Sequence, residues 1–87
     1  MHDLIEIKVV CHSGYKADEY PVRFYWDNIL FEIEEIEDRW YQGEQKPEFS
    51  AAVYFKVRTT EKKIYILKHE IQRDKWYLWI RGESINL

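Results

Sequence analysis

Apolar and polar residues alternate along most of this chain, the pattern of strands that bury one face. The alternating segments are rich in β-branched and aromatic residues, which fit a pleated sheet surface. They are LIEIKVV (4–10), PVRFYW (21–26), AAVYFKVRTT (51–60), KKIYILKH (62–69) and KWYLWI (75–80). Short polar joints such as TTEK and IQRD separate the later segments at the spacing of hairpins. The pattern therefore predicts an all-β chain.

The phase of the alternation predicts which side chains form the core. In each strand we assign the more consistently apolar side to the interior. The expected core consists of Phe24, Trp26, Ile33, Val53, Phe55, Val57, Ile64, Ile66, Trp76 and Leu78. This choice places Tyr65 and Leu67 on the opposite side of their strand.

Residues 27–43, DNILFEIEEIEDRWYQG, fit two structures. A stripe of apolar residues at helical spacing (Ile29, Ile33, Ile36 and Trp40), with a capping Asp27 or Asn28, indicates a helix over about 28–42. As a strand, the segment would follow an Asp-Asn hairpin turn, and the Glu34–Glu35 pair would form a β-bulge. We expect the strand and keep the helix as the alternative.

The opposite side of the last three predicted strands interleaves aromatic rings with cations. This candidate binding face consists of Tyr54, Lys56, Arg58, Lys63, Tyr65, Tyr77, Trp79 and Arg81. Rings that stack bases beside cations that contact phosphates are typical of single-strand nucleic-acid binders. The same residues also suit a protein interface, self-association, or simple cross-strand stabilisation of the sheet.

The segment CHSGYKADEYP (11–21) brings together the single Cys, a His, a Ser and several charged residues. Adjacent residues of an extended chain point to opposite faces, so Cys11 and His12 are poorly placed to act as nucleophile and base. Ser13-Gly14 has the composition of a turn. We expect no catalysis here. If the segment has a role, it is recognition through a loop of Tyr15, Lys16, Asp18 and Glu19.

Composition narrows the class of protein further. The chain has 87 residues and a net charge of −3, and its one Cys excludes an internal disulfide. It contains no apolar run long enough for a membrane span and no secretory signal pattern, so we expect a cytoplasmic protein. Residues 27–48 hold eight acidic and two basic side chains, whereas residues 49–87 hold eight basic and four acidic ones. The acidic cluster Glu32, Glu34, Glu35, Glu37 and Asp38 alternates with apolar residues like a solvated face, so we expect no metal site or cofactor.

Four segments resemble a group of small uncharacterised bacterial proteins. These are SGYKADEYPVRF (13–24), FEIEEIEDRWYQG (31–43), YFKVRTTEKKIYILKHE (54–70) and DKWYLWI (74–80). The positions that match the group are Phe31, Ile33, Glu35, Ile36, Asp38, Trp40, Tyr54, Phe55, Val57, Arg58, Tyr65, Ile66, Leu67, Trp76 and Leu78. The resemblance implies a compact β-meander with no catalytic residues to carry over. The chain departs from the group in the insertion YQGEQKPEFSAA (41–52) and in Asp27-Asn28.

Together these observations predict one small domain over residues 1–87, with five or six antiparallel strands in a strongly bent sheet or half-open barrel. The expected function is that of a non-enzymatic accessory or protein-interaction module that binds another protein or a second copy of itself. The alternative is a single-stranded nucleic-acid-binding module that uses the basic and aromatic sheet face.

Overall fold

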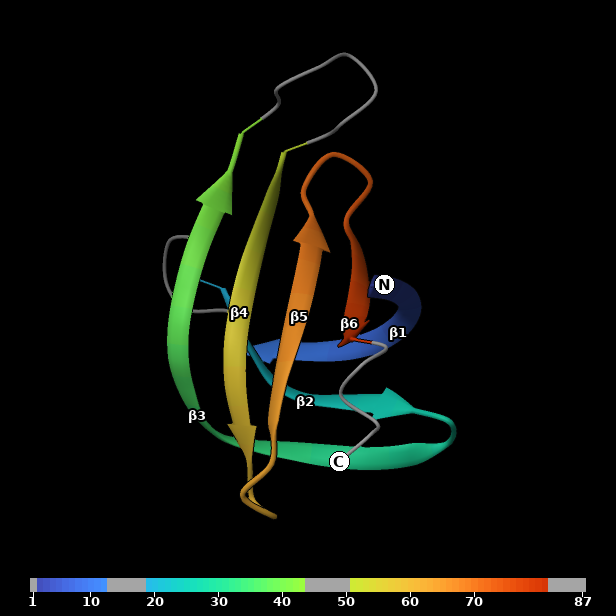
Figure 1. Cartoon of the computed structure of the whole chain (residues 1–87), viewed down its shortest axis with the longest axis vertical. Helices are drawn as coiled ribbons and strands as arrows, with labels where there is room; N and C mark the ends of the chain where they lie inside the picture. Colours follow the sequence, from blue (N-terminus) through green and yellow to red (C-terminus); the bar gives the residue numbers. More distant parts are fainter. Residues whose placement is uncertain (1, 13–18, 44–50, 82–87) are drawn as a thin grey trace.

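The computed structural model describes residues 2–12, 19–43 and 51–81, and all of its regular structure is β. The strands are β1 (His2–His12), β2 (Tyr20–Trp26), β3 (Ile29–Gln42), β4 (Ala52–Thr59), β5 (Ile64–Glu70) and β6 (Lys75–Arg81). Consecutive strands pair antiparallel, and β6 pairs with β1 to close a barrel, which confirms the predicted all-β meander (Figure 1). Within the described residues, no helix is long and apolar enough to cross a membrane.

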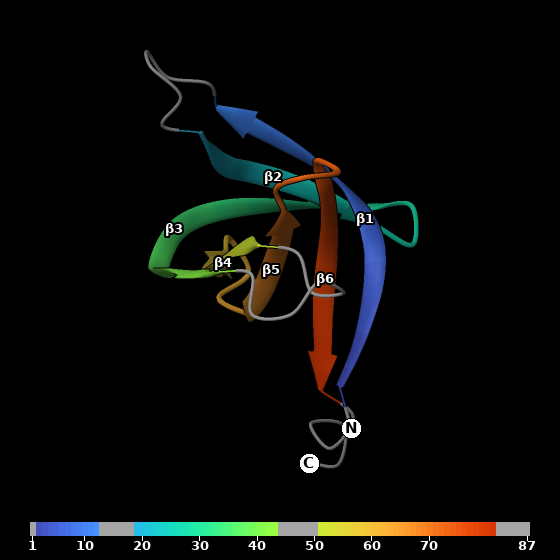
Figure 2. The ribbon, with the colours of Figure 1, turned by 90° about the horizontal axis from the view of Figure 1, so that it is seen from above.

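Two long, bent strands join the two sides of the barrel. The first half of β1 pairs with β6 from His2 to Ile7, and its second half pairs with β2 from Lys8 onward. In the same way, β3 pairs with β2 up to Glu32 and with β4 from Ile33. Figure 2 shows both strands curving from one side of the barrel to the other. The fold is therefore two small sheets that share β1 and β3.

The contested segment 27–43 forms a hairpin turn and a strand, so the helical alternative over 28–42 is wrong. Asp27 and Asn28 have φ of 58° and 64°, the left-handed conformation that a tight hairpin turn requires and that Asp and Asn tolerate. The register of β3 against β4 shifts between Ile33 and Glu35, where the bulge was predicted, and again between Ile36 and Asp38. The two bulges break the alternation of β3, and this break produced the apparent helical stripe.

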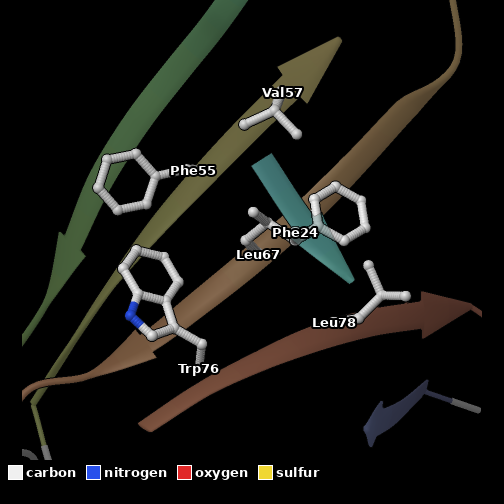
Figure 3. Packing of buried hydrophobic residues seen from close by; sticks show 6 residues of the cluster. All are labelled: Phe24, Phe55, Val57, Leu67, Trp76 and Leu78. Atoms are coloured by element: carbon white, nitrogen blue, oxygen red, sulfur yellow. The ribbon is translucent and has the colours of Figure 1, made fainter. Parts of the chain in front are cut away.

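Six side chains from four strands form the centre of the core, and Figure 3 shows them turned toward one another. They are Phe24, Phe55, Val57, Leu67, Trp76 and Leu78. The Phe55 and Trp76 rings lie 5.6 Å apart, and Phe24 stacks on Phe31 of β3 at 4.9 Å. Aromatic pairs at these separations add to the stabilisation from burial. Trp26, Ile33 and Val53 are partly buried against this centre, as expected.

The core assignment was wrong for β5. The strand pairs Leu67 with Phe55 of β4 and Leu78 of β6, and directly opposite residues share a face. Leu67 is therefore fully buried, whereas Ile64 is 45 % exposed and Ile66 lies on the outer face. Period two alone could not choose between two apolar sides of this strand; the register with β4 decides the choice.

Candidate interaction surface

The outer face of β3, β4, β5, β6 and β1 carries two continuous rows of side chains, which follow from the strand register. Residues that are directly opposite one another across the antiparallel pairs lie on the same face. The first row runs Asp38, Lys56, Ile66, Trp79 and Leu4, and the second runs Trp40, Tyr54, Lys68, Tyr77 and Glu6. We call the four aromatic residues of these rows (Trp40, Tyr54, Tyr77 and Trp79) and their two lysines (Lys56 and Lys68) the aromatic platform.

Tyr54 lies at the centre of the platform. Its ring is parallel to that of Trp40 at 5.3 Å and is tilted against Trp79 at 5.8 Å. Its hydroxyl donates a hydrogen bond of 2.9 Å to the side-chain oxygen of Gln42. Partial burial among these neighbours raises the pKa of the Tyr54 hydroxyl. The contacts hold three large rings in fixed positions, so little conformational entropy would be lost when a ligand covers them.

Neither platform lysine forms an ion pair with a carboxylate of the described residues, although Asp38 lies opposite Lys56 across β3 and β4. The Nζ of Lys68 lies 5.9 Å from the centre of the Tyr54 ring, a cation–π contact. Lys56 is exposed on the neighbouring row. Within the described part of the chain, no ion pair involves either lysine. The platform therefore offers two positive charges beside its rings.

Arg58, on the same strand, is instead occupied by acidic residues of β3. Its guanidinium donates hydrogen bonds to Glu34 at 2.8 Å, to Glu37 at 2.7 Å and to Glu35. These carboxylates, Glu34 foremost, raise the pKa of Arg58. Hydrogen bonds from Lys62 and Arg58 lower the pKa of Glu34. The acidic and basic parts of the sequence thus meet across β3 and β4, and a ligand would have to compete with three carboxylates for Arg58.

A pocket of about 770 Å³ opens at one side of the platform. It is lined by Trp26, Asp38, Trp40, Lys56, Ile64, Tyr65, Ile66, Leu78, Trp79 and Ile80. Three Trp residues and several aliphatic ones with one cation and one anion make a lining that is mostly apolar. Such a lining suits an apolar side chain of a ligand, with the charged groups fixing its orientation.

The structure brings together part of the predicted binding face. Tyr54, Lys56, Tyr77 and Trp79 are neighbours on the platform. Tyr65, in contrast, lies on the inner face, edge-on to the rings of Phe24 and Phe31 at 5.6 and 5.5 Å. Its inclusion in the face was wrong because the phase of β5 was reversed.

The other predicted residues lie away from the platform or outside the described structure. Lys63 belongs to the turn between β4 and β5, where its backbone N–H and C=O bond to Thr59. Arg81 ends β6, and its side chain is outside the described part of the chain. Of the predicted recognition loop, Tyr15, Lys16 and Asp18 lie outside the described residues, and Glu19 is exposed just before β2.

The predicted binding face left out six members of the two outer rows, which are Leu4, Glu6, Asp38, Trp40, Ile66 and Lys68. Trp40 was assigned to a helical stripe or to the family resemblance. Its spacing of two residues from the polar Asp38 and Gln42 was the signal that places it on the same, outer face once β3 is a strand. Ile66 and Lys68 were missed because the phase of β5 was reversed.

The cysteine and histidines do not form a nucleophile–base pair among the described residues. Burial, followed by the charges of Glu19 and Asp74, raises the pKa of the Cys11 thiol to about 11, so it is protonated at neutral pH. The His12 ring packs against Tyr20 at 5.2 Å. The Nε2 of His69 lies 2.8 Å from a carboxylate oxygen of Asp74, and its ring stacks on Trp76 at 4.3 Å. Residues 2–12, 19–43 and 51–81 contain no cluster of three or more His, Cys, Asp or Glu that could bind a metal ion.

Comparison with known proteins finds no matching family model, no similar curated protein and no similar solved structure. The resemblance to small bacterial β-proteins stays an expectation from the sequence.

Proposed function

We propose that this chain is a non-enzymatic protein-interaction module whose aromatic platform binds an acidic, apolar segment of a partner protein. The observation that carries the proposal is the fixed cluster of Trp40, Tyr54 and Trp79 on the outer face of the barrel. Trp and Tyr are the residues most enriched in the energetically important centres of protein interfaces. Trp40 remains 37 % exposed although it stacks on Tyr54, so its ring keeps area to offer a partner.

The charge of the platform favours an acidic segment. Lys56 and Lys68 lie among the rings and have no ion pair within the described residues. A partner carboxylate near either lysine would form an ion pair that is partly shielded from water by the rings. Complementary charge of this kind speeds association and fixes the register of the bound segment.

Nucleic acid is less well supported as the ligand. Arg58, the strongest expected phosphate contact, is bound by three carboxylates. A phosphate backbone carries a charge at every nucleotide, so Asp38 and Glu6 at the ends of the two outer rows would repel it, whereas a peptide can place its carboxylates beside Lys56 and Lys68 alone. The net charge of the chain, −3, also opposes attraction of a polyanion.

The test uses a phage-displayed library of random 12-residue peptides and a mixed-sequence single-stranded DNA as probes. Peptides selected on the wild-type protein should combine acidic with aromatic or aliphatic residues. Trp40→Ala and Lys68→Glu should each weaken their binding about tenfold or more, measured by fluorescence anisotropy. Tyr41→Ala and Lys63→Glu are the matched controls, because Tyr41 is 64 % exposed and Lys63 lies in a turn outside the platform.

The two proposed ligands give different results in the same assay. The logarithm of the affinity for a nucleic acid falls linearly with the logarithm of the salt concentration, and the number of phosphate contacts sets the slope. An interface with an apolar centre depends much less on salt. DNA binding that Trp40→Ala abolishes and that peptides do not displace would overturn the proposal. So would a library in which no selected peptide binds Trp40→Ala or Lys68→Glu more weakly than it binds the controls.

A further inference from the structure

A second surface lies where β1 changes its pairing partner. Residues His2 to Ile7 pair with β6, and β2 joins β1 only from Lys8, opposite Tyr25. The edge of residues 4–7 that faces away from β6 is therefore not paired with any described strand. In an antiparallel pair, every second residue directs its N–H and C=O away from its partner strand. With respect to the described residues, this part of β1 thus presents a short row of unpaired backbone donors and acceptors.

The unpaired edge borders a hollow of about 1360 Å³, which we call the β1 notch. The notch is lined by residues 5–10 of β1 and residues 25–28 of the hairpin between β2 and β3. In the ribbon of Figure 2, the tip of this hairpin extends beyond β1, which bends away toward β6. The β1 segment and the β2–β3 hairpin, which we call the two arms of the notch, diverge from the last β1–β2 pair, Lys8 and Tyr25.

Both arms of the notch expose apolar side chains. Ile5 and Tyr25, which line the notch, are 36 % and 40 % exposed, and Leu4, Ile29 and Leu30, which adjoin the lining on the same strands, are exposed as well. Half of the large hydrophobic residues that are exposed in the described structure thus lie on these two arms. Contiguous exposed apolar side chains commonly mark interaction sites. Natural proteins usually protect such an edge with charged side chains, proline or a bulge; residues 4–7 contain no proline and no bulge, and the charge of Glu6 is paired with Lys75.

We infer that the β1 notch binds an extended segment of a partner protein by β-strand addition. A polypeptide strand provides backbone acceptors and donors that can pair with those of the β1 edge, and its alternate side chains would contact the apolar arms. The charges at the notch do not favour a polyanion or a polycation, because Glu6, Lys8 and Asp27 are of both signs. Glu6 is also already paired with Lys75 at 3.2 Å. The bound strand should therefore carry apolar residues at alternate positions and little net charge.

This inference does not depend on the aromatic platform, and its experiment separates the two surfaces. Peptides are selected from the same random 12-residue library, and those whose binding is unchanged by Trp40→Ala are retained. Ile29→Lys should weaken their binding about tenfold or more, since it places a charge on the apolar hairpin arm. The matched control is Ile71→Lys, because Ile71 is similarly exposed but lies in the turn between β5 and β6.

Backbone pairing has its own signature, which side-chain contacts do not produce. In the free protein, amide hydrogen exchange should be fast at alternate residues of the 4–7 segment, and bound peptide should protect those same amides. Two sets of N-methylated peptides are compared, one methylated at the odd and one at the even positions. Methylation of the set whose N–H groups face β1 should weaken binding about tenfold, and methylation of the other set should have little effect. Uniformly slow exchange over residues 4–7 in the free protein would overturn the inference, because the edge would then already be paired. A library that yields no peptide sensitive to both Ile29→Lys and N-methylation would also overturn it.

Discussion

Leu67→Ala provides the most direct test of the barrel, because its expected effect depends on which face of β5 lies inward. The structure places Leu67 between Phe55 and Leu78, and it is 0 % exposed. The sequence pattern alone had favoured Ile64 and Ile66 for the interior. A comparison of Leu67→Ala with Ile64→Ala therefore distinguishes the two phases of one strand.

The magnitude follows from the buried groups that the substitution removes. Replacing Leu67 by Ala removes three carbon atoms, which is worth about 2.4 kcal/mol at about 0.8 kcal/mol per buried methylene group. The cavity that remains between Phe55 and Leu78 adds to this cost, so the total should be about 3–4 kcal/mol. Ile64 is 45 % exposed, and Ile64→Ala should cost about 1 kcal/mol or less.

The assay is urea unfolding followed by tryptophan fluorescence, with a thermal melt as a second measurement. A domain of 87 residues is expected to have a total stability of about 4–13 kcal/mol. Leu67→Ala should therefore lower the melting temperature by about 15–25 °C, if it leaves the protein folded at all. If Ile64→Ala destabilises the protein as much as Leu67→Ala does, the phase of β5 and the register with β4 are wrong.

Three further predictions follow from local features of the barrel. Asn28→Val should lower the free energy of unfolding by about 1–2 kcal/mol, because a β-branched residue tolerates a φ of 64° poorly, whereas Asn28→Gly should not destabilise the protein; denaturant titration of both variants checks this. Arg58→Met should be less stable than the wild type at about pH 7, and the difference should shrink toward about pH 3. Lys62 and Arg58 lower the pKa of Glu34 below its ordinary value of 4.5, so the stabilisation from these ion pairs is complete above pH 4.5 and is lost as the pH falls through the lowered pKa. Urea titrations of both proteins at the two pH values measure the difference in stability. A difference that stays constant with pH would contradict the ion-pair account. The rise of the Cys11 pKa from 9.0 to about 11 should slow alkylation by iodoacetamide at about pH 8 roughly a hundredfold relative to the urea-unfolded chain; mass spectrometry follows the reaction, and equal rates would mean that the thiol is not buried.

The sequence was sufficient to predict those elements that depend on a few adjacent residues, such as a turn or a bulge. Asp27-Asn28 predicted the hairpin turn, since few other residue types adopt a positive φ at low cost. The Glu34–Glu35 pair predicted the bulge, because it interrupts an otherwise regular alternation. The closure of the barrel through β1 and β6 is a contact between distant parts of the chain, and no local pattern indicates it.

The phase of a strand was predictable where only one of its sides is consistently apolar. Tyr54 and Lys56 lie on β4, where the inner residues Phe55 and Val57 are unambiguously apolar, so the phase was correct. On β5, isoleucines alternate with Tyr65 and Leu67, and either phase buries apolar side chains. A change of one residue in the length of the preceding turn reverses every side chain of such a strand. That is why Tyr65 was placed outside and Lys68 was overlooked.

The pairing of β1 with β6 has a consequence for synthesis of the protein on the ribosome. His12 and Lys75 are 63 positions apart, so at about 5–20 residues per second β1 emerges several seconds before its partner exists. During that interval the LIEIKVV segment of β1 lacks β6, and such β-branched apolar strands are prone to pair with other chains. Once β2 has been made, it can cover only the second half of β1. The first half stays exposed until β6 has been translated, so a slow codon or a truncation before residue 75 should increase aggregation of the nascent chain more than the same change placed after β6.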